Sequence, residues 1–206
     1  DSAETYPVSY VKKARDGKTG RLLGYVESEF TSAIIGFGKT GQEALKFLYE
    51  FGTFVGKDKG KIPFQCHIFD DNASQKAGEL RRKIYFPDKE EVLFTSCRVE
   101  SDRFWEGLEK VIHRMNYIIV CLGDDRANLK TAIEIAEFAL RKGRSLNDKF
   151  IIAFHQRELS LLDKETIEKA NKTFGNSLRP FGMLKDIWTL KVIKADSITT
   201  MAKKFY

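Results

Sequence analysis

From Ser32 onward the chain alternates short apolar runs with longer segments in which apolar residues recur every three or four positions. The short runs predict β-strands, which we place at residues 32–36, 64–69, 92–95, 117–122 and 149–154. The longer segments predict amphipathic helices that begin near Thr40 and Ser101 or cover residues 73–83, 126–144 and 164–174. Alternating strands and helices predict an α/β fold, here a Rossmann-type doubly wound parallel sheet with helices on both faces and small N- and C-terminal additions.

Both ends of the chain lie outside this alternation. Residues 6–26 predict two short strands joined by a hairpin turn at 16–20, and residues 178–206 predict a strand near 187–189 and a helix near 198–205. We therefore expect an N-terminal extension at 1–30, a Rossmann domain at 31–155 and a C-terminal α/β extension at 156–206 packed on the same domain. Because the chain begins with Asp1 rather than Met, we expect it to be a piece of a longer protein.

The composition is that of a soluble globular protein, with 42% hydrophobic and 31% charged residues among 206. The apolar runs are far shorter than the roughly 20 residues that cross a bilayer. Three cysteines without paired spacing indicate structural free thiols in a reducing compartment. The net charge of +6 (35 basic minus 29 acidic residues) comes with basic clusters, but acidic residues are mixed through the chain. We interpret the clusters as solvated faces and expect no nucleic-acid partner.

A glycine-rich turn follows the first predicted strand of the alternation. It reads Gly36-Phe37-Gly38-Lys39-Thr40-Gly41, and an amphipathic helix comes next. In the G-x-G-x-x-G pattern the first glycine allows a tight turn, the second lets a pyrophosphate approach the backbone, and the third lets the helix lie close to the strand. Phosphates would then bind at the N-terminus of the helix. Lys39 either adds a positive charge there or points to solvent.

The second predicted strand ends in Asp70, which is followed by Asp71. An acid in this place binds the ribose hydroxyls of a dinucleotide and, because it would repel a 2′-phosphate, favours NAD over NADP. Asp70 lies 29 residues after Gly41 (70 minus 41), whereas the usual spacing is about 20 residues. A loop at 52–63 accounts for the excess. The alternative for Asp70 is a solvated strand end or a helix cap.

Two further strand ends complete the expected crevice, because ligands bind at the carboxyl ends of the strands in open α/β sheets. Thr95 and Ser96 end the third strand and are expected on the adenine side. Leu122 and Gly123 follow the most apolar strand, and Gly123 leaves room for a ligand. The aspartates at 124 and 125 are expected to cap the next helix.

No catalytic constellation is evident. The three histidines are scattered: His67 and His113 lie among apolar neighbours, where a structural role is expected, and His155 follows the fifth strand. We find no nucleophile elbow, no metalloprotease helix and no cluster of metal ligands. The sequence therefore favours a binding protein over an enzyme and predicts no catalytic residues and no metal.

Taken together, the motifs resemble the RCK or TrkA-N domains, NAD(P)-binding Rossmann domains that regulate potassium channels and transporters. The resemblance covers residues 31–155 and rests on the segments at 34–41, 68–70 and 118–129, the last of which is an aliphatic strand followed by Gly123-Asp124-Asp125 and then Asn128. It implies that Gly36, Gly38, Gly41 and Asp70 contact the ligand and that Asn128 lies near the crevice. The chain departs from the family at 52–63 and in its last 50 residues.

These observations favour a regulatory nucleotide-binding module, with NAD as the first expected ligand and ATP, ADP or AMP as others. The alternatives are an NAD-dependent oxidoreductase, a methyltransferase, and an interaction scaffold that has lost its ligand. The expected partners are the nucleotide, a second copy of the chain in a homodimer, and a linked or separate membrane protein. The expected location is cytoplasmic, including the cytosolic part of a membrane-associated protein.

Overall fold

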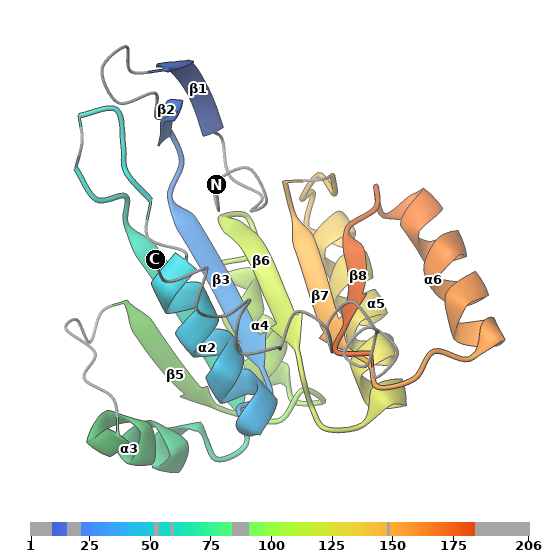
Figure 1. Ribbon diagram of the computed structural model, residues 1–206. Helices are drawn as coiled ribbons and strands as arrows, with labels where there is room; N and C mark the ends of the chain where they lie inside the picture. Colours follow the sequence, from blue (N-terminus) through green and yellow to red (C-terminus); the bar gives the residue numbers. More distant parts are fainter. Residues whose placement is uncertain are drawn as a thin grey trace, which may run out of the picture.

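The computed structural model describes residues 10–15, 22–51, 54–58, 60–83, 91–147 and 149–183 (Figure 1). The strands are β1 (Tyr10–Arg15), β2 (Leu22–Val26), β3 (Phe30–Ile35), β4 (Phe64–Asp70), β5 (Val92–Ser96), β6 (Met115–Val120), β7 (Ile151–His155) and β8 (Leu178–Phe181). The helices are α2 (Lys39–Phe51), α3 (Ala73–Lys83), α4 (Asp102–Glu109), α5 (Asp125–Arg141) and α6 (Leu161–Thr173). Strand and helix alternate from β3 to α6, as the sequence predicts, and β8 continues the alternation.

Six of these strands form one sheet in the order β5-β4-β3-β6-β7-β8, and all neighbours in it are parallel. Counted along the chain from β3, this order is 3-2-1-4-5-6, the order of the doubly wound Rossmann fold. The order reverses between β3 and β6, and such a switch point opens a crevice at the carboxyl ends of the two strands. The chain therefore has the Rossmann-type α/β fold that its sequence predicts.

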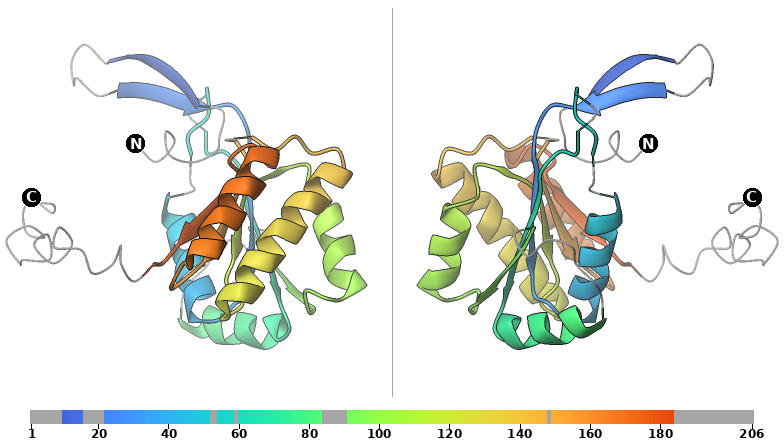
Figure 2. Two further views of the ribbon diagram at one scale, coloured as in Figure 1. Left: turned by 90° about the vertical axis from the view of Figure 1, so that its right-hand side faces the viewer. Right: turned by 90° about the vertical axis from the view of Figure 1, so that its left-hand side faces the viewer.

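Helices cover both faces of the sheet, as Figure 2 shows with the sheet seen on edge. Helices α2 and α3 pack on one face through Leu45, Leu48 and Leu80, and α4, α5 and α6 pack on the other. Successive side chains of a strand point to opposite faces, so Ile34 belongs to the first core and Ile35 to the second. Both are fully buried, which explains why the second half of the strand, residues 33–35, is apolar on both faces.

The N-terminal hairpin lies at the end of the sheet where the parallel strands begin (Figure 2). Its strands β1 and β2 pair antiparallel, and the predicted turn at 16–20 lies outside the described residues. The insertion after α2 lies at the same end, because the Val26 N–H donates to the Val55 carbonyl at 2.9 Å and the Phe30 N–H donates to the Pro63 carbonyl at 3.2 Å. The insertion therefore lengthens the chain between Gly41 and Asp70 at the end of the sheet opposite the carboxyl ends of the strands.

Several predicted boundaries differ from the structure. Strand β8 was not predicted from the sequence, and the predicted strand at 187–189 and helix at 198–205 lie outside the described residues. Helix α4 ends at Glu109, so His113 lies in an exposed turn rather than on a helix among apolar neighbours. Helix α6 begins at Leu161 because Ser160 and Asp163 form a capping box. The division of the chain at residues 30 and 155 stays a prediction.

None of the helices in the described part of the chain is long and apolar enough to cross a membrane.

Candidate functional site

The glycine-rich turn joins β3 to α2, and two of its glycines are required by the packing of the protein itself. Gly36 has a φ of +89°, and a Cβ on it would lie 2.5 Å from the main-chain oxygen of Cys121 at the end of β6. A Cβ on Gly41 would lie 2.3 Å from the Gly36 oxygen. These two glycines therefore let β3, β6 and α2 approach one another closely, as the sequence pattern predicts.

Gly38 differs from both of these glycines. It is exposed, its φ is not in the left-handed region, and a Cβ on it would meet nothing within 4 Å. Neither the backbone conformation nor the packing of the described residues requires glycine here. Glycine at this place instead leaves the backbone open to a ligand at the start of α2, where the first N–H groups of a helix have no partner within the helix.

Asp70, the last residue of β4, is held from several sides. Its Oδ2 accepts the Phe37 N–H at 2.6 Å, its Oδ1 accepts the Asn72 N–H at 2.9 Å, and the Lys76 ammonium binds both oxygens at 2.7 and 2.8 Å. Burial raises the pKa of Asp70, but the hydrogen bonds from Lys76, Phe37 and Asn72 outweigh burial and hold the pKa below its ordinary value. Asp70 is therefore an ionised, paired carboxylate that fixes the shape of the glycine turn.

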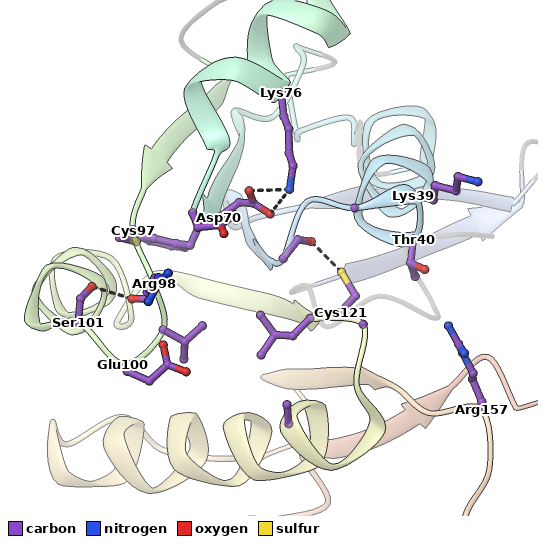
Figure 3. A pocket seen from close by; sticks show the side chains of 18 residues that line it. Lys39, Thr40, Asp70, Lys76, Cys97, Arg98, Glu100, Ser101, Cys121 and Arg157 are labelled. Carbon is purple, nitrogen blue, oxygen red and sulfur yellow. Dashed lines mark hydrogen bonds and ion pairs between the residues drawn. The ribbon is translucent and has the colours of Figure 1, made fainter.

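A cavity of about 980 Å³ opens at the carboxyl ends of β3, β4, β5 and β6 (Figure 3). It is large enough for a nucleotide. The predicted site residues that line it are Gly36, Gly38, Lys39, Thr40, Asp70, Asp71, Leu122 and Gly123. In Figure 3 the Lys39 side chain extends away from the Asp70 end of the cavity, whereas Thr40 faces its interior.

Three further predicted site residues are buried and do not line the cavity. Phe37 is fully buried, and its ring packs edge-on against Phe94 at 5.5 Å between centroids. Gly41 is buried in the first turn of α2. Asn128 is fully buried as well: its Oδ1 accepts the Leu122 N–H at 2.7 Å, and its Nδ2 donates to the His155 oxygen at 2.8 Å. Asn128 thus ties the end of β6 to the end of β7, and both its polar atoms are engaged by the protein.

After β5, the residues that line the cavity come later in the chain than the two that the sequence predicts. Thr95 and Ser96 do not line the cavity; Ser96 Oγ accepts the Ser74 N–H at 3.1 Å, which satisfies a donor at the start of α3. The residues that line the cavity here are Cys97 to Ser101. Ser101 precedes α4, but its hydroxyl donates to the Arg98 oxygen at 2.6 Å instead of capping the helix.

Three basic side chains of the cavity could not be predicted from the sequence, because no motif spacing marks them. Lys76 comes from α3 and Arg98 from the loop after β5. Arg157 follows β7, and its main-chain N–H donates to Asp125 Oδ2 at 2.9 Å, which holds its loop against the start of α5. In Figure 3 Arg157 lies across from Thr40. The Arg157–Asp125 bond joins residues 32 positions apart, so only the fold reveals it.

Two thiols lie in the cavity wall. Cys121 Sγ donates to the Gly36 oxygen at 3.0 Å, beneath the glycine turn, and burial raises the pKa of its thiol to about 12. Cys97 is half-buried, and burial raises its pKa as well. Cys66, the third cysteine, is fully buried in β4, and burial raises the pKa of its thiol to about 12. All are free thiols, as the sequence predicts.

None of the histidines lines the cavity. His67 lies within β4, His113 is exposed, and the His155 ring packs edge-on against Phe181 at 5.5 Å between centroids. Within the described ranges, no group of three or more His, Cys, Asp or Glu side chains is placed to hold a metal ion. The cavity wall instead combines backbone at glycines with lysine, arginine, aspartate and hydroxyl groups, which is chemistry suited to phosphate and sugar.

No protein-family model matches the chain, and no curated protein matches it in sequence. Solved structures similar to it include the GsuK channel, at 14% identity and a TM-score of 0.45 over 77% of this chain and 22% of that one. The imine reductase BcSIRED from Bacillus cereus BAG3X2 is 13% identical, with a TM-score of 0.41 over 74% of this chain and 39% of that one. Homoserine dehydrogenase from S. aureus is 12% identical, with a TM-score of 0.44 over 75% and 32%.

The chain thus spans well under half the length of these three structures. The class of the protein follows from its own strand order and glycine turn: it is a Rossmann-type α/β domain with a cavity at the switch point of its sheet.

Proposed function

We propose that the chain is a regulatory nucleotide-binding module of the RCK or TrkA-N type that binds a dinucleotide of the NAD class in the cavity at the switch point. The observation that carries the proposal is Gly38. Neither the backbone conformation nor the packing at position 38 requires glycine, yet Gly38 lies where a diphosphate would approach the start of α2.

The cavity supports this placement on both sides of Gly38. On one side lie Asp70 and Lys76, at the strand end where the adenosine ribose binds in this fold. On the other side lie Gly123, with a φ of +95°, and Arg157. The pyrophosphate would lie between these two ends, and the Thr40 hydroxyl and the Arg157 guanidinium would serve as additional donors to it.

In the proposed regulatory role, the nucleotide binds without turnover. It acts by binding one conformational or oligomeric state more tightly than another, because only a difference in affinity shifts an equilibrium. The state is read by a second copy of the chain or by a linked or partner membrane protein, as the family resemblance implies. No catalytic residue is assigned, and the proposed location is cytosolic.

Thermal unfolding of the chain in the presence of NADP, NAD, ATP, ADP, AMP and S-adenosylmethionine tests the proposal. A nucleotide at 100 times its dissociation constant stabilises the fold by about 2.7 kcal/mol, which raises the melting temperature of a domain of this size by about 5–10 °C. Gly38→Asp should remove the shift, because its carboxylate would repel the pyrophosphate.

Gly78→Asp is the matched control. Gly78 is exposed on α3, a Cβ on it also meets nothing within 4 Å, and it does not line the cavity. A dinucleotide shift that Gly78→Asp retains and Gly38→Asp loses supports the proposal. No shift with any of these nucleotides would favour the interaction scaffold, and a shift that survives in Gly38→Asp would place the ligand elsewhere.

A further inference from the structure

The hydrogen-bonding capacity of Asp70 is already filled by the protein. Its Oδ1 accepts from Asn72 N at 2.9 Å and Lys76 Nζ at 2.7 Å, and its Oδ2 accepts from Phe37 N at 2.6 Å and Lys76 Nζ at 2.8 Å. A carboxylate offers about four lone-pair sites, and this side chain is 7% exposed. Asp70 therefore has no acceptor to spare for the hydrogens of a ribose diol unless Lys76 leaves.

The side chains that this end of the cavity offers to a ligand are donors. Lys76 is 28% exposed and lines the cavity; an ammonium has three N–H groups, and Asp70 engages only two. Arg98 lines the same end, because the preceding residue, Cys97, donates its N–H to the Asp70 main-chain oxygen at 3.0 Å. The Arg98 guanidinium has no hydrogen bond or ion pair within the part of the chain that the structure describes.

Two acids, Asp71 and Glu100, also line the cavity, and both are exposed. Asp71 accepts the Asn72 side-chain amide at 3.1 Å. In Figure 3 the Glu100 carboxylate lies beyond Arg98, on the side away from Lys76. Water and salt screen these exposed charges strongly. The charge of Asp70 is paired with Lys76, so the polar groups that remain for a ligand at this end are the third N–H of Lys76 and the Arg98 guanidinium.

A hydroxyl group and a phosphate make different demands on such a subsite. A ribose 2′-hydroxyl donates one hydrogen and needs an acceptor for it, whereas a 2′-phosphate presents only acceptor oxygens that bind cationic donors. The expectation of NAD assumed that Asp70 presents an unpaired negative charge, and Lys76 neutralises that charge.

We propose that the Lys76–Arg98 end of the cavity binds a phosphate on the adenosine ribose, so that the chain prefers NADP(H) to NAD(H). This inference rests on the proposed function, because it requires a dinucleotide in the cavity. It assigns Lys76 and Arg98 as the residues that determine specificity and Asp70 as the residue that positions Lys76.

Titration calorimetry of the full chain with NADP and NAD, and with 2′,5′-ADP and ADP, tests the inference. The wild-type chain should bind the 2′-phosphorylated member of each pair about tenfold more tightly or better, the scale of one charged hydrogen bond. Lys76→Gln should remove or reverse the preference, since it removes the cation and frees Asp70 for the ribose diol. Lys76→Arg should restore it.

Arg98→Gln keeps the test decisive if Lys76→Gln unfolds, because Arg98 is exposed and its guanidinium supports no described contact. It should weaken the binding of NADP about tenfold and the binding of NAD by much less. Lys130→Gln on α5 is the control, since Lys130 is 75% exposed and outside the cavity. NAD binding as tight as NADP in the wild-type chain overturns the inference and leaves the proposed function standing, whereas binding of neither dinucleotide overturns both.

Discussion

Asp70 holds the main chain of Phe37: the carboxylate at the end of β4 accepts the N–H at the centre of the glycine turn at 2.6 Å, across 33 positions of sequence. The turn follows β3, the neighbouring parallel strand, so the bond closes the corner between two strands and α2. Lys76 binds the same carboxylate from α3. The shape of the phosphate-binding turn and the charge of the adjoining subsite therefore depend on a single buried acid.

Asp70→Asn should lower the free energy of unfolding by about 1–3 kcal/mol at pH 7. An amide cannot accept all the hydrogen bonds that the carboxylate accepts, and Lys76 would lose its partner. Urea unfolding followed by circular dichroism measures the loss. Asp71→Asn is the control: Asp71 is exposed, and we expect a change within about 0.5 kcal/mol.

The same pair of proteins gives a pH test. The pKa of Asp70 is held below its ordinary value by Lys76, Phe37 and Asn72, which outweigh burial. Its stabilising contribution is therefore present above the unfolded-state pKa of about 3.9 and is lost as the pH falls through the lower pKa of the folded state. The difference in stability between wild type and Asp70→Asn should be constant from pH 7 to about 5 and shrink toward pH 3. A difference that grows on acidification would contradict the ion pair.

Alanine at the first two glycines of the turn should separate folding from binding. Gly36→Ala should destabilise the fold by more than about 1 kcal/mol, because Gly36 has a φ of +89° and its Cβ would lie 2.5 Å from the Cys121 oxygen. Gly38→Ala should leave the free energy of unfolding unchanged or slightly raised, since its Cβ meets nothing within 4 Å. The Gly38→Ala protein should nonetheless bind dinucleotide more weakly. Equal effects of the two substitutions on stability would contradict the assigned roles.

The cysteines predict a chemical footprint. In the native chain iodoacetamide at pH 8 should modify Cys97 first, because burial raises the pKa of Cys66 and Cys121 to about 12 and excludes the reagent. Bound dinucleotide should slow the modification of Cys97, which lines the cavity. Peptide mass spectrometry identifies the labelled site, and Cys97→Ser should leave the native chain almost unlabelled. Earlier modification of Cys121 would be inconsistent with the packed turn.

His67 predicts a loss of stability in mild acid. Its Nε2 is buried without a hydrogen-bond partner among the described residues, and burial, followed by the charge of Arg114, lowers the pKa of its imidazole. The unfolded chain therefore takes up a proton near the ordinary pKa of about 6.5, whereas the folded chain takes it up only at a lower pH, so the free energy of unfolding falls below pH 6.5. His67→Gln should make the midpoint of urea unfolding less dependent on pH between pH 8 and 5.5. His113 and His155 are present in both proteins. If the urea midpoint depends on pH equally in both, this role of His67 is refuted.

Much of the central fold could be predicted, because its signals are local. The run that forms β3, the glycines after it and the apolar periodicity of α2 lie within about 20 consecutive residues, and parallel strands buried on both faces read as continuous apolar runs. Strand β8 could not be found in this way. It is the four-residue segment Leu178–Phe181 at the edge of the sheet, it contains Pro180, and its Arg179 is exposed.

The cavity was predicted less completely than the fold, for a related reason. Gly36, Gly38 and Asp70 have fixed places in a known motif, but nothing in the sequence shows that Lys76 turns back onto Asp70 or that Asp125 holds the Arg157 loop. For Asn128 the position could be predicted but the role of the side chain could not. Its position near the crevice was expected, yet its amide is used to join β6 and β7. Side-chain partners are decided by packing, which spacing alone does not reveal.

The most direct measurement of the central claim is to map NADP onto the ¹⁵N-labelled chain through its amide NMR shifts. Binding in the cavity predicts saturable shifts concentrated at Gly38, Thr40, Gly123 and the loop from Cys97 to Ser101, with the β1–β2 hairpin at the other end of the sheet unaffected. Shifts centred away from the glycine turn, or no shift at millimolar NADP, NAD and ATP, would contradict the claim that this Rossmann domain binds a nucleotide at its switch point.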